Sequence, residues 1–193
     1  SAQLPYSLIS ASLKNRTAKE KIARYALSII DDNDDILFDA GSTTEVLASL
    51  LPSHYTGSVM CFSFNVLTHI LNRDDIEVTV TGGNFHRSSM IFESTESIQM
   101  VQNRRVHKAF ISASGIHTRL GVTCSNDYET ELKRAGIKSA EQRILLIDAS
   151  KFSDFNHFHF ADIQDFDIII TDNSLSESIK SEFQNIGVDL RIV

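Results

Sequence analysis

The sequence has no tryptophan and only two prolines and two cysteines among 193 residues. So little proline excludes a proline-rich linker, and ordinary apolar (42%) and charged (22%) fractions exclude extensive disorder. Cys61 and Cys124 lie far apart without C-x-x-C spacing, and Cys61 lies in an apolar run, where a thiol behaves as a small hydrophobe. This use of cysteine fits a reducing compartment.

The sequence also lacks a run of about 18 uncharged apolar residues. Its first residues, SAQLPYSLISASLK, do not show the basic and then apolar order of a signal peptide. We therefore expect no membrane-spanning segment and a cytoplasmic location. The net charge is −7, and no basic block extends beyond Arg104-Arg105, so this chain alone is not expected to hold DNA.

Several well-known functional motifs are absent. The sequence contains no G-x-G-x-x-G, no G-x-x-x-x-G-K-[ST] and no G-x-S-x-G, which argues against dinucleotide, P-loop and α/β-hydrolase sites. His157 and His159 would share one face of a strand, but a metal site needs a third ligand. We predict neither a metal nor a cofactor.

The length suits one domain with a well-filled core, covering residues 1–193. Residues 1–13 are expected to be a linker or a remnant of cloning. Because the first residue is not Met, a segment could be missing upstream.

Short β-prone runs alternate with helical patterns along the chain. Most runs are continuously apolar, as in strands buried on both faces; they cover 36–38, 58–64, 76–80, 107–112, 143–147, 167–171 and 188–193. Helices are predicted over 17–30 and near 46–51, 66–71, 132–136 and 175–183. The alternation predicts an α/β fold, with a mostly parallel sheet, helices on both faces and right-handed crossovers. Residues 150–163 depart from it and are expected to form a loop or small excursion.

Small polar residues follow every predicted strand but the last. In chain order they are Asp39, Gly41, Ser42, Thr43 and Thr44; Ser63 and Asn65; Thr81, Gly82, Gly83 and Asn84; Ser112, Ser114 and Gly115; Asp148, Ser150 and Lys151; and Thr171, Asp172 and Asn173. These are also ordinary residues of βα turns and helix caps, so each loop alone has a purely structural explanation. Because ligands of open α/β sheets bind beyond the carboxyl ends of the strands, the loops together indicate a site for a small phosphorylated or polyhydroxylated ligand.

The loop at residues 39–44 is the best candidate for a phosphate site. No bulky side chain occurs from Ala40 to Thr44, and the following helix offers free N–H groups and a positive dipole end. The segment 42–45 also fits a capping box in which Ser42 is the cap and Glu45 reaches back, so Glu45 could compete with an anion. Lys151 adds a cation at the same edge of the sheet.

Other charged residues allow two interpretations. Asp127, Glu129 and Glu131 could supply carboxylates for acid–base chemistry, or could decorate a helix start opposite Lys133 and Arg134. The sequence does not determine which of Asp127, Glu129 and Lys133 reach the pocket. His86 and Arg87 could contact an anion, or could be ordinary exposed residues of a loop.

Several ordered motifs resemble the C-terminal, effector-sensing domain of the DeoR family of bacterial transcriptional repressors, from about Lys14 to Val193. They are FDAGSTTEVLASLL (38–51), FSFNVL (62–67), VTGGNFHRSSMIF (80–92), AFISASGIHTRLGVT (109–123), LIDASKF (146–152) and DIIITD (167–172). FSFN, GGNFH, SASGIH and GVTCSN look most similar to the branch that regulates deoxyribonucleoside catabolism. That branch implies deoxyribose 5-phosphate as effector, and the family as a whole implies a pentose or hexose phosphate.

The resemblance implies a fold similar to ribose-5-phosphate isomerase, glucosamine-6-phosphate deaminase and CoA-transferases. It also implies a homo-oligomer, with operator DNA bound only by a winged helix-turn-helix domain upstream of Ser1. By motif, the ligand-binding residues would be Asp39, Gly41, Ser42, Thr43 and Thr44 in the first loop; Ser63 and Asn65 in the second; Gly82 and Gly83 as points of close backbone approach; Ser112, Ser114 and Gly115 in the next wall; and Lys151 facing the ligand.

Two departures bear on this expectation. Phe64 lies between Ser63 and Asn65 and is bulkier than the residue that many family members have at this position, which alters the shape of the second loop of the predicted site. The loop at 112–115 lacks the acidic residues of isomerases, and a proton shuttle needs a positioned base, so a non-enzymatic sensor is predicted. The alternatives are a sugar-phosphate isomerase using Asp39, Asp127 or Asp148 as base, and a plain oligomerisation domain.

Overall fold

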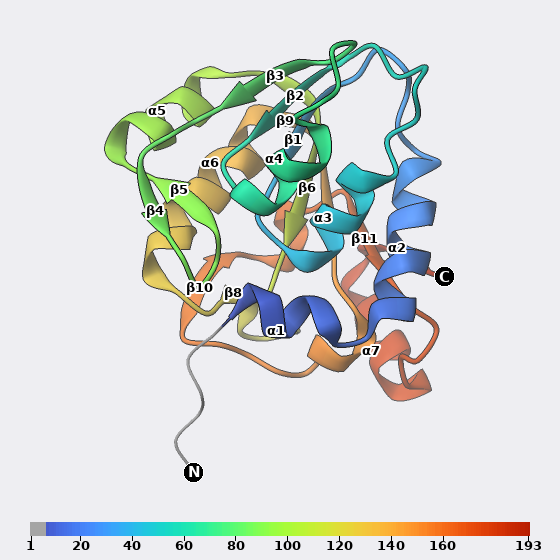
Figure 1. The fold of residues 1–193 in the computed structure, drawn as a ribbon. Helices are drawn as coiled ribbons and strands as arrows, with labels where there is room; N and C mark the ends of the chain where they lie inside the picture. Colours follow the sequence, from blue (N-terminus) through green and yellow to red (C-terminus); the bar gives the residue numbers. More distant parts are fainter. Residues whose placement is uncertain (1–6) are drawn as a thin grey trace.

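A parallel β-sheet forms the centre of the fold in the computed structural model, which describes residues 7–193 (Figure 1). Seven strands lie in the order β12-β11-β9-β6-β1-β2-β3, and each neighbouring pair is parallel. All seven correspond to predicted runs: β1 (Asp35–Phe38), β2 (Ser58–Cys61), β3 (Glu77–Val80), β6 (Val106–Ser112), β9 (Ala140–Leu146), β11 (Ile168–Thr171) and β12 (Asp189–Ile192). The predicted α/β fold with a parallel sheet is confirmed.

Helices cover both faces of this sheet. One face carries α2 (Arg16–Leu27), α3 (Ser42–Ser49) and α4 (Phe64–Ile70); the other carries α5 (Thr95–Asn103), α6 (Thr130–Ser139) and α7 (Glu177–Ile186). Alternate residues of a strand point to opposite faces, so Leu37 packs in the α6 layer while Ile36 and Phe38 pack in the α3 layer. Five of these helices match predicted patterns, and α5 was not predicted.

Two small antiparallel sheets extend from the main one. The first contains β7 (Gly115–His117), β8 (Gly121–Cys124) and β10 (Phe158–Ala161), and the second is the hairpin of β4 (Asn84–His86) and β5 (Ile91–Glu93). Residues 150–163 were expected to form a loop or small excursion. They contain strand β10, and a short 3-10 turn, η2 (Ala149–Lys151), overlaps their start. The hairpin requires Gly83, because its φ is +112° and a Cβ there would lie 2.6 Å from the Glu93 carbonyl oxygen.

The strand order reverses between β1 and β6. From β1 the chain adds β2 and β3 on one side, and it then returns to add β6, β9, β11 and β12 on the other. The loops that leave β1 and β6 therefore diverge to opposite faces of the sheet. A crevice opens at such a reversal, beyond the carboxyl ends of the strands.

Residues 8–13, for which a linker or cloning remnant was expected, form helix α1 (Leu8–Leu13), which packs against α3. Leu8 is buried, and its N–H donates to the Ser88 carbonyl at 2.8 Å. Lys19 of α2 donates to the carbonyls of Ala11 and Lys14 at the other end of α1. Residues 1–6 of that expectation lie outside the described part of the chain.

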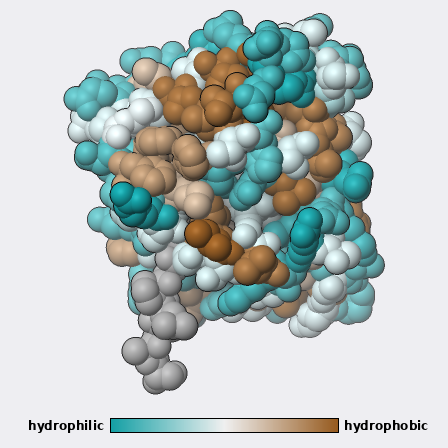
Figure 2. All heavy atoms as spheres, viewed as in Figure 1, coloured by the Kyte–Doolittle hydropathy of each residue, from teal (hydrophilic) through white to brown (hydrophobic). Residues whose placement is uncertain are grey.

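The outer side of α1 is apolar. Ile9 and Leu13 are exposed, and hydrophobic patches lie among hydrophilic side chains on the face that carries this helix (Figure 2). No helix within residues 7–193 is both long and apolar enough to span a membrane.

A buried ion pair joins the ends of β1 and β6 to α6. The Lys133 Nζ lies 2.5 Å from the Asp39 Oδ2, and both side chains are almost completely buried. Lys133 also donates to the Ser112 carbonyl at 2.9 Å, while the N–H and hydroxyl of Ser112 each donate to the Asp39 Oδ2 at 2.8 Å. Three segments far apart in sequence thus meet at one carboxylate.

The pair keeps Lys133 charged. Burial alone would lower the pKa of Lys133, but the charges of Asp39 and Glu129 outweigh it and raise that pKa above its ordinary value. A raised lysine pKa contributes stability below the unfolded-state value, and that stability is lost only as the pH rises through the folded-state value. Lys133 is therefore charged at neutral pH.

Removal of the cation should destabilise the fold strongly. We expect Lys133→Met to lower the free energy of unfolding by about 3–5 kcal/mol, because Asp39 would stay buried without a counter-charge. Urea denaturation at pH 7 measures this value. The matched control is Glu20→Gln, which breaks the exposed Arg16–Glu20 pair and should cost less than about 1 kcal/mol. Equal losses in the two variants would contradict the importance of the buried pair.

Candidate functional site

A cavity of about 430 Å³ lies at the carboxyl ends of β1 and β6, where the strand order reverses. Its lining consists of small, polar and charged residues: Ser7, Ser10, Ala11, Lys14, Ala40, Gly41, Ser42, Thr43, Ser112, Ala113, Ser114, Ser125, Glu129, Ser150, Lys151, Asp154 and Asn156. The volume suits a small molecule, and the lining suits a strongly polar one.

The N-terminus of α3 forms one wall of this cavity. Gly41 is the N-cap and Ser42 the first helical residue, so the predicted capping box is wrong. A Cβ at Gly41 would lie 2.4 Å from the Ser112 Oγ, and the close approach of that loop therefore requires glycine at the cap. The Glu45 carboxylate instead bonds to Asn65 at 3.2 Å and to His69 at 3.3 Å. No side chain at the cap or at Glu45 then occupies the first N–H groups of α3, which is the condition for anion binding.

Lysines surround this helix start. Lys14 and Lys151 line the cavity, and the Lys151 Nζ donates to the Ala113 carbonyl at 2.9 Å. Burial, assisted by the charge of Lys133, lowers the pKa of Lys151 despite the opposing charge of Asp148. Burial, assisted by Lys151, likewise lowers the pKa of Lys19 to about 8. Positive charge thus gathers beside the start of α3, and Asp148, whose Oδ2 lies 3.8 Å from the Lys151 Nζ, and the lining residues Glu129 and Asp154 offset part of it.

Two predicted site residues, Asp39 and Thr44, stabilise the loop at residues 39–44 from the protein interior. Asp39 and Thr44 are fully buried and do not line the cavity. The Thr44 hydroxyl donates to the carbonyls of Asp39 and Gly41 at 2.8 and 2.9 Å. These contacts hold the loop in shape, so both residues act on a ligand only through it.

The structure separates the thirteen predicted site residues into two groups. Those that line the cavity are Gly41, Ser42, Thr43, Ser112, Ser114 and Lys151, and those that do not are Asp39, Thr44, Ser63, Asn65, Gly82, Gly83 and Gly115. Their participation in ligand binding stays a prediction.

The residues outside the lining have structural contacts instead. Asn65 donates to the Gly41 carbonyl at 3.3 Å, and Ser63 is fully buried next to the β4–β5 hairpin. Gly82 and Gly83 lead into that hairpin. Gly115 begins β7, where a Cβ would lie 2.8 Å from the Asp154 carbonyl oxygen.

Sequence reasoning missed several lining residues. Ser10 belongs to the segment 1–13 that was expected to be a linker, Lys14 directly follows that segment, and Ser125 and Asn156 come from outside the main sheet. Ser125 bonds to the Ser114 hydroxyl at 3.0 Å, and Asn156 donates to the Ser114 carbonyl at 3.1 Å. Ser125 and Asn156 reach the cavity because β8 pairs antiparallel with β7 and β10, and no local sequence motif predicts this pairing.

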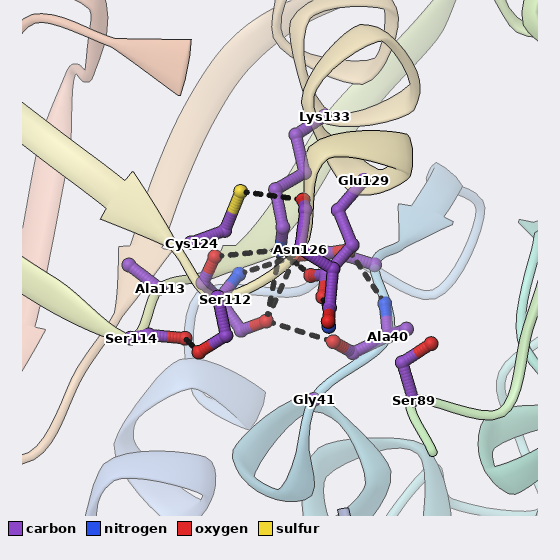
Figure 3. Close-up of polar contacts among 12 residues, drawn as sticks. Ala40, Gly41, Ser89, Ser112, Ala113, Ser114, Cys124, Asn126, Glu129 and Lys133 are labelled. Atoms are coloured by element: carbon purple, nitrogen blue, oxygen red, sulfur yellow. Dashed lines mark hydrogen bonds and ion pairs between the residues drawn. The ribbon is translucent and has the colours of Figure 1, made fainter. Parts of the chain in front are cut away.

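Of the three charged residues left open by the sequence, only Glu129 reaches the cavity. It ends the 3-10 turn η1 (Asp127–Glu129) and precedes α6, from which Lys133 extends toward Ser112 (Figure 3). Burial raises the pKa of Glu129, although Lys133 and a 2.6 Å hydrogen bond from Asn126 oppose the shift.

The three carboxylates considered as isomerase bases are not presented to the cavity. Asp39 is held by Lys133 and Ser112, and Asp127 is outside the lining. Asp148 is 2% exposed and accepts hydrogen bonds from Asn15 at 3.0 Å and from the Ser150 N–H at 3.2 Å.

Solved structures with a similar fold include ribose 5-phosphate isomerase A from Methanocaldococcus jannaschii. The TM-score is 0.54 at 16% identity, with 72% of this chain and 55% of that chain covered. The eIF2B beta subunit from Chaetomium thermophilum gives a TM-score of 0.55 at 14% identity, covering 80% of this chain and 48% of that one. At such low identity, these similarities establish the fold alone.

Curated relatives are bacterial regulators. The chain is 29% identical over 161 residues to the deoxyribose operon repressor of Escherichia coli K12, covering 82% of this chain and 64% of the repressor. It is 31% identical over 166 residues to the L-fucose operon activator of Haemophilus influenzae, covering 86% of this chain and 66% of the activator. The chain thus spans slightly less than two thirds of the length of these regulators.

Residues 14–173 match the family described as the DeoR C terminal sensor domain. That range includes β1, β6, α3, α6 and most of the cavity lining. With most of its length matched, this chain belongs to the family of DeoR C-terminal sensor domains.

Proposed function

We propose that this domain binds a phosphorylated sugar in the cavity between β1 and β6, and thereby controls a cytoplasmic DeoR-family transcriptional regulator. One observation carries the proposal. An uncapped helix N-terminus, two lysines and a group of hydroxyls line the same cavity at the strand-order reversal. Such a set can bind a phosphate and a polyol at once.

The phosphate is proposed to bind at the start of α3. The N–H groups after Gly41 meet the positive end of the helix dipole there, and Lys14 and Lys151 supply charge. The side chains of Ser42 and Thr43 offer further hydrogen-bond donors.

The sugar is proposed to contact the part of the cavity lined by Ser114, Ser125 and Asn156. Ser114, Ser125 and Asn156 form a hydrogen-bonded group there, and each can exchange hydrogen bonds with a sugar hydroxyl. Deoxyribose 5-phosphate is our first candidate, since the motifs resemble the deoxyribonucleoside branch and one relative is named a deoxyribose operon repressor. Other pentose or hexose phosphates are the next candidates.

Operator DNA is proposed to bind to an N-terminal winged helix-turn-helix domain outside this chain, in a homo-oligomer. Helix α1 offers a route for coupling, because its residue Ser10 and its C-cap residue Lys14 line the cavity and it is the first described helix of the domain. The ligand can change DNA affinity only by binding one state of the regulator better than the other.

Sugar phosphates should stabilise the domain against heat. At a ligand concentration 100-fold above Kd, a ligand that binds only the folded state adds about 2.7 kcal/mol, or a rise in Tm of about 5–10 °C. The measurement is a thermal-shift panel of pentose, deoxypentose and hexose phosphates, with inorganic phosphate and unphosphorylated sugars as controls. No shift with any sugar phosphate at millimolar concentration would refute the proposal.

Two substitutions should abolish that shift without unfolding the protein. Ser42→Glu places a negative charge at the proposed phosphate position, and Lys151→Ala removes an ammonium contact, costing at least about tenfold in affinity. Ser49→Glu, at the exposed far end of α3, and Lys138→Ala, on the exposed side of α6, are the matched controls. Unchanged binding in both cavity variants would mean that the ligand binds elsewhere.

Ligand affinity should fall in mildly alkaline solution. The pKa of Lys151 is lowered, so the free protein loses this ammonium at a lower pH than an ordinary lysine would, whereas a phosphate monoester is fully ionised above about pH 7. Titration calorimetry from pH 7.5 to 10 should show Kd rising with pH, and rising less in Lys151→Arg, which stays charged. Comparison of the two proteins separates Lys151 from Lys19. Equal slopes would exclude Lys151 from the phosphate site.

A further inference from the structure

Two residues of α4 hold the side chain of Glu45, which lies in the first turns of α3. The Asn65 Nδ2 donates to the Glu45 Oε2 at 3.2 Å, and the His69 Nε2 lies 3.3 Å from the Glu45 Oε1. Asn65 and His69 are four residues apart, so they share the face of α4 that contacts α3. Both oxygens of the carboxylate therefore have a partner outside their own helix.

The amide of Asn65 is oriented by the hydrogen bonds that it donates. The same Nδ2 also donates to the carbonyl of Gly41, the cap residue of α3, at 3.3 Å. The Asn65 side chain is almost completely buried, and its Oδ1 has no hydrogen-bond partner among residues 7–193. Because a buried acceptor without a partner is costly, the two donated bonds must maintain this orientation. Asn65 thus joins Glu45 to the cap of α3.

The carboxylate of Glu45 has the chemistry to compete for the proposed phosphate position. The Glu45 N–H donates to the Gly41 carbonyl at 2.9 Å, so the backbone N–H groups of residues 42–44 have no acceptor within the helix. A helical side chain leans over the turn that precedes it, and for Glu45 that turn is 41–44. The N–H groups and the helix dipole that attract a phosphate there attract a carboxylate as well.

We propose, on the basis of the proposed function, that Asn65 and His69 are positioning residues that keep the Glu45 carboxylate away from the start of α3. Held by α4, Glu45 is outside the cavity lining, and the N–H groups that follow Gly41 are available to a phosphate. Released from α4, the carboxylate turns toward those N–H groups and repels the phosphate that would bind them. Asn65 and His69 therefore affect the ligand through Glu45, without touching it.

The test is a double-mutant cycle between Asn65 and Glu45. Deoxyribose 5-phosphate, ribose 5-phosphate and glucose 6-phosphate are titrated by calorimetry, and the one that binds the wild type most tightly is used. Asn65→Leu removes both donated bonds with a side chain of similar volume, and its Kd should rise about tenfold or more. With Glu45→Gln present the competing charge is gone, so adding Asn65→Leu should change Kd by less than about threefold.

His69→Leu is a second, independent variant for the case in which Asn65→Leu does not fold. The His69 side chain is partly exposed, and its loss leaves the bond from Asn65 to Gly41 in place. Its Kd should rise about threefold or more, and this rise should also disappear in the presence of Glu45→Gln. Thermal unfolding without ligand shows that each variant is folded.

Two matched controls should leave Kd unchanged. Glu177→Gln removes an exposed first-turn glutamate from α7, and His54→Leu breaks an exposed pair with Asp32. The inference is overturned if Asn65→Leu weakens binding equally with and without Glu45→Gln, or if every folded variant of Asn65 and His69 binds like the wild type. Both results leave sugar-phosphate binding by the wild type intact, whereas a wild type that binds no sugar phosphate overturns the proposed function as well.

Discussion

The contact between Asp39 and Lys133 fixes the geometry on which the other features of the site depend. It links the elements at the strand-order reversal, because the same carboxylate accepts from the Ala40 N–H just after β1, from Ser112 at the end of β6 and from the Lys133 side chain of α6. This brings Ser112 against the loop at Gly41 so closely that only glycine fits at the cap of α3. The uncapped amides of α3 are thus a consequence of a charge pair that lies outside the cavity lining.

Charge is distributed unevenly around this pair. The whole chain carries a net charge of −7, yet Lys14, Lys19 and Lys151 lie near the start of α3, where burial and neighbouring ammonium groups lower the pKa values of Lys19 and Lys151. The cavity lining also includes Glu129, Asp154 and uncharged hydrogen-bonding side chains. The lining therefore combines basic, acidic and uncharged hydrogen-bonding groups around one cavity.

The sequence was sufficient for the main sheet because continuously apolar runs such as 168–171 have few alternatives to a strand buried on both faces. It was also sufficient for the loops at Gly41 and Ser112, which directly follow β1 and β6. The sequence did not predict the hydrogen-bond partner of Glu45. Its carboxylate bonds to Asn65 and not to the start of α3, and that contact joins two loops that are distant in sequence. The same holds for Lys14 and Asn156, which reach the cavity by tertiary packing.

Helix α1 has only six residues, well below the length at which a helix persists alone in water. Helix α1 is stabilised instead by tertiary contacts. Leu8 is buried, the Leu8 N–H donates to the Ser88 carbonyl, and the Lys19 ammonium donates to the carbonyls of Ala11 and Lys14. The free energy that keeps α1 folded is therefore supplied by its tertiary contacts with α2 and with the segment at Ser88. A domain joined to the N-terminal end of α1 would be attached to the element of the fold that depends most on its neighbours for order.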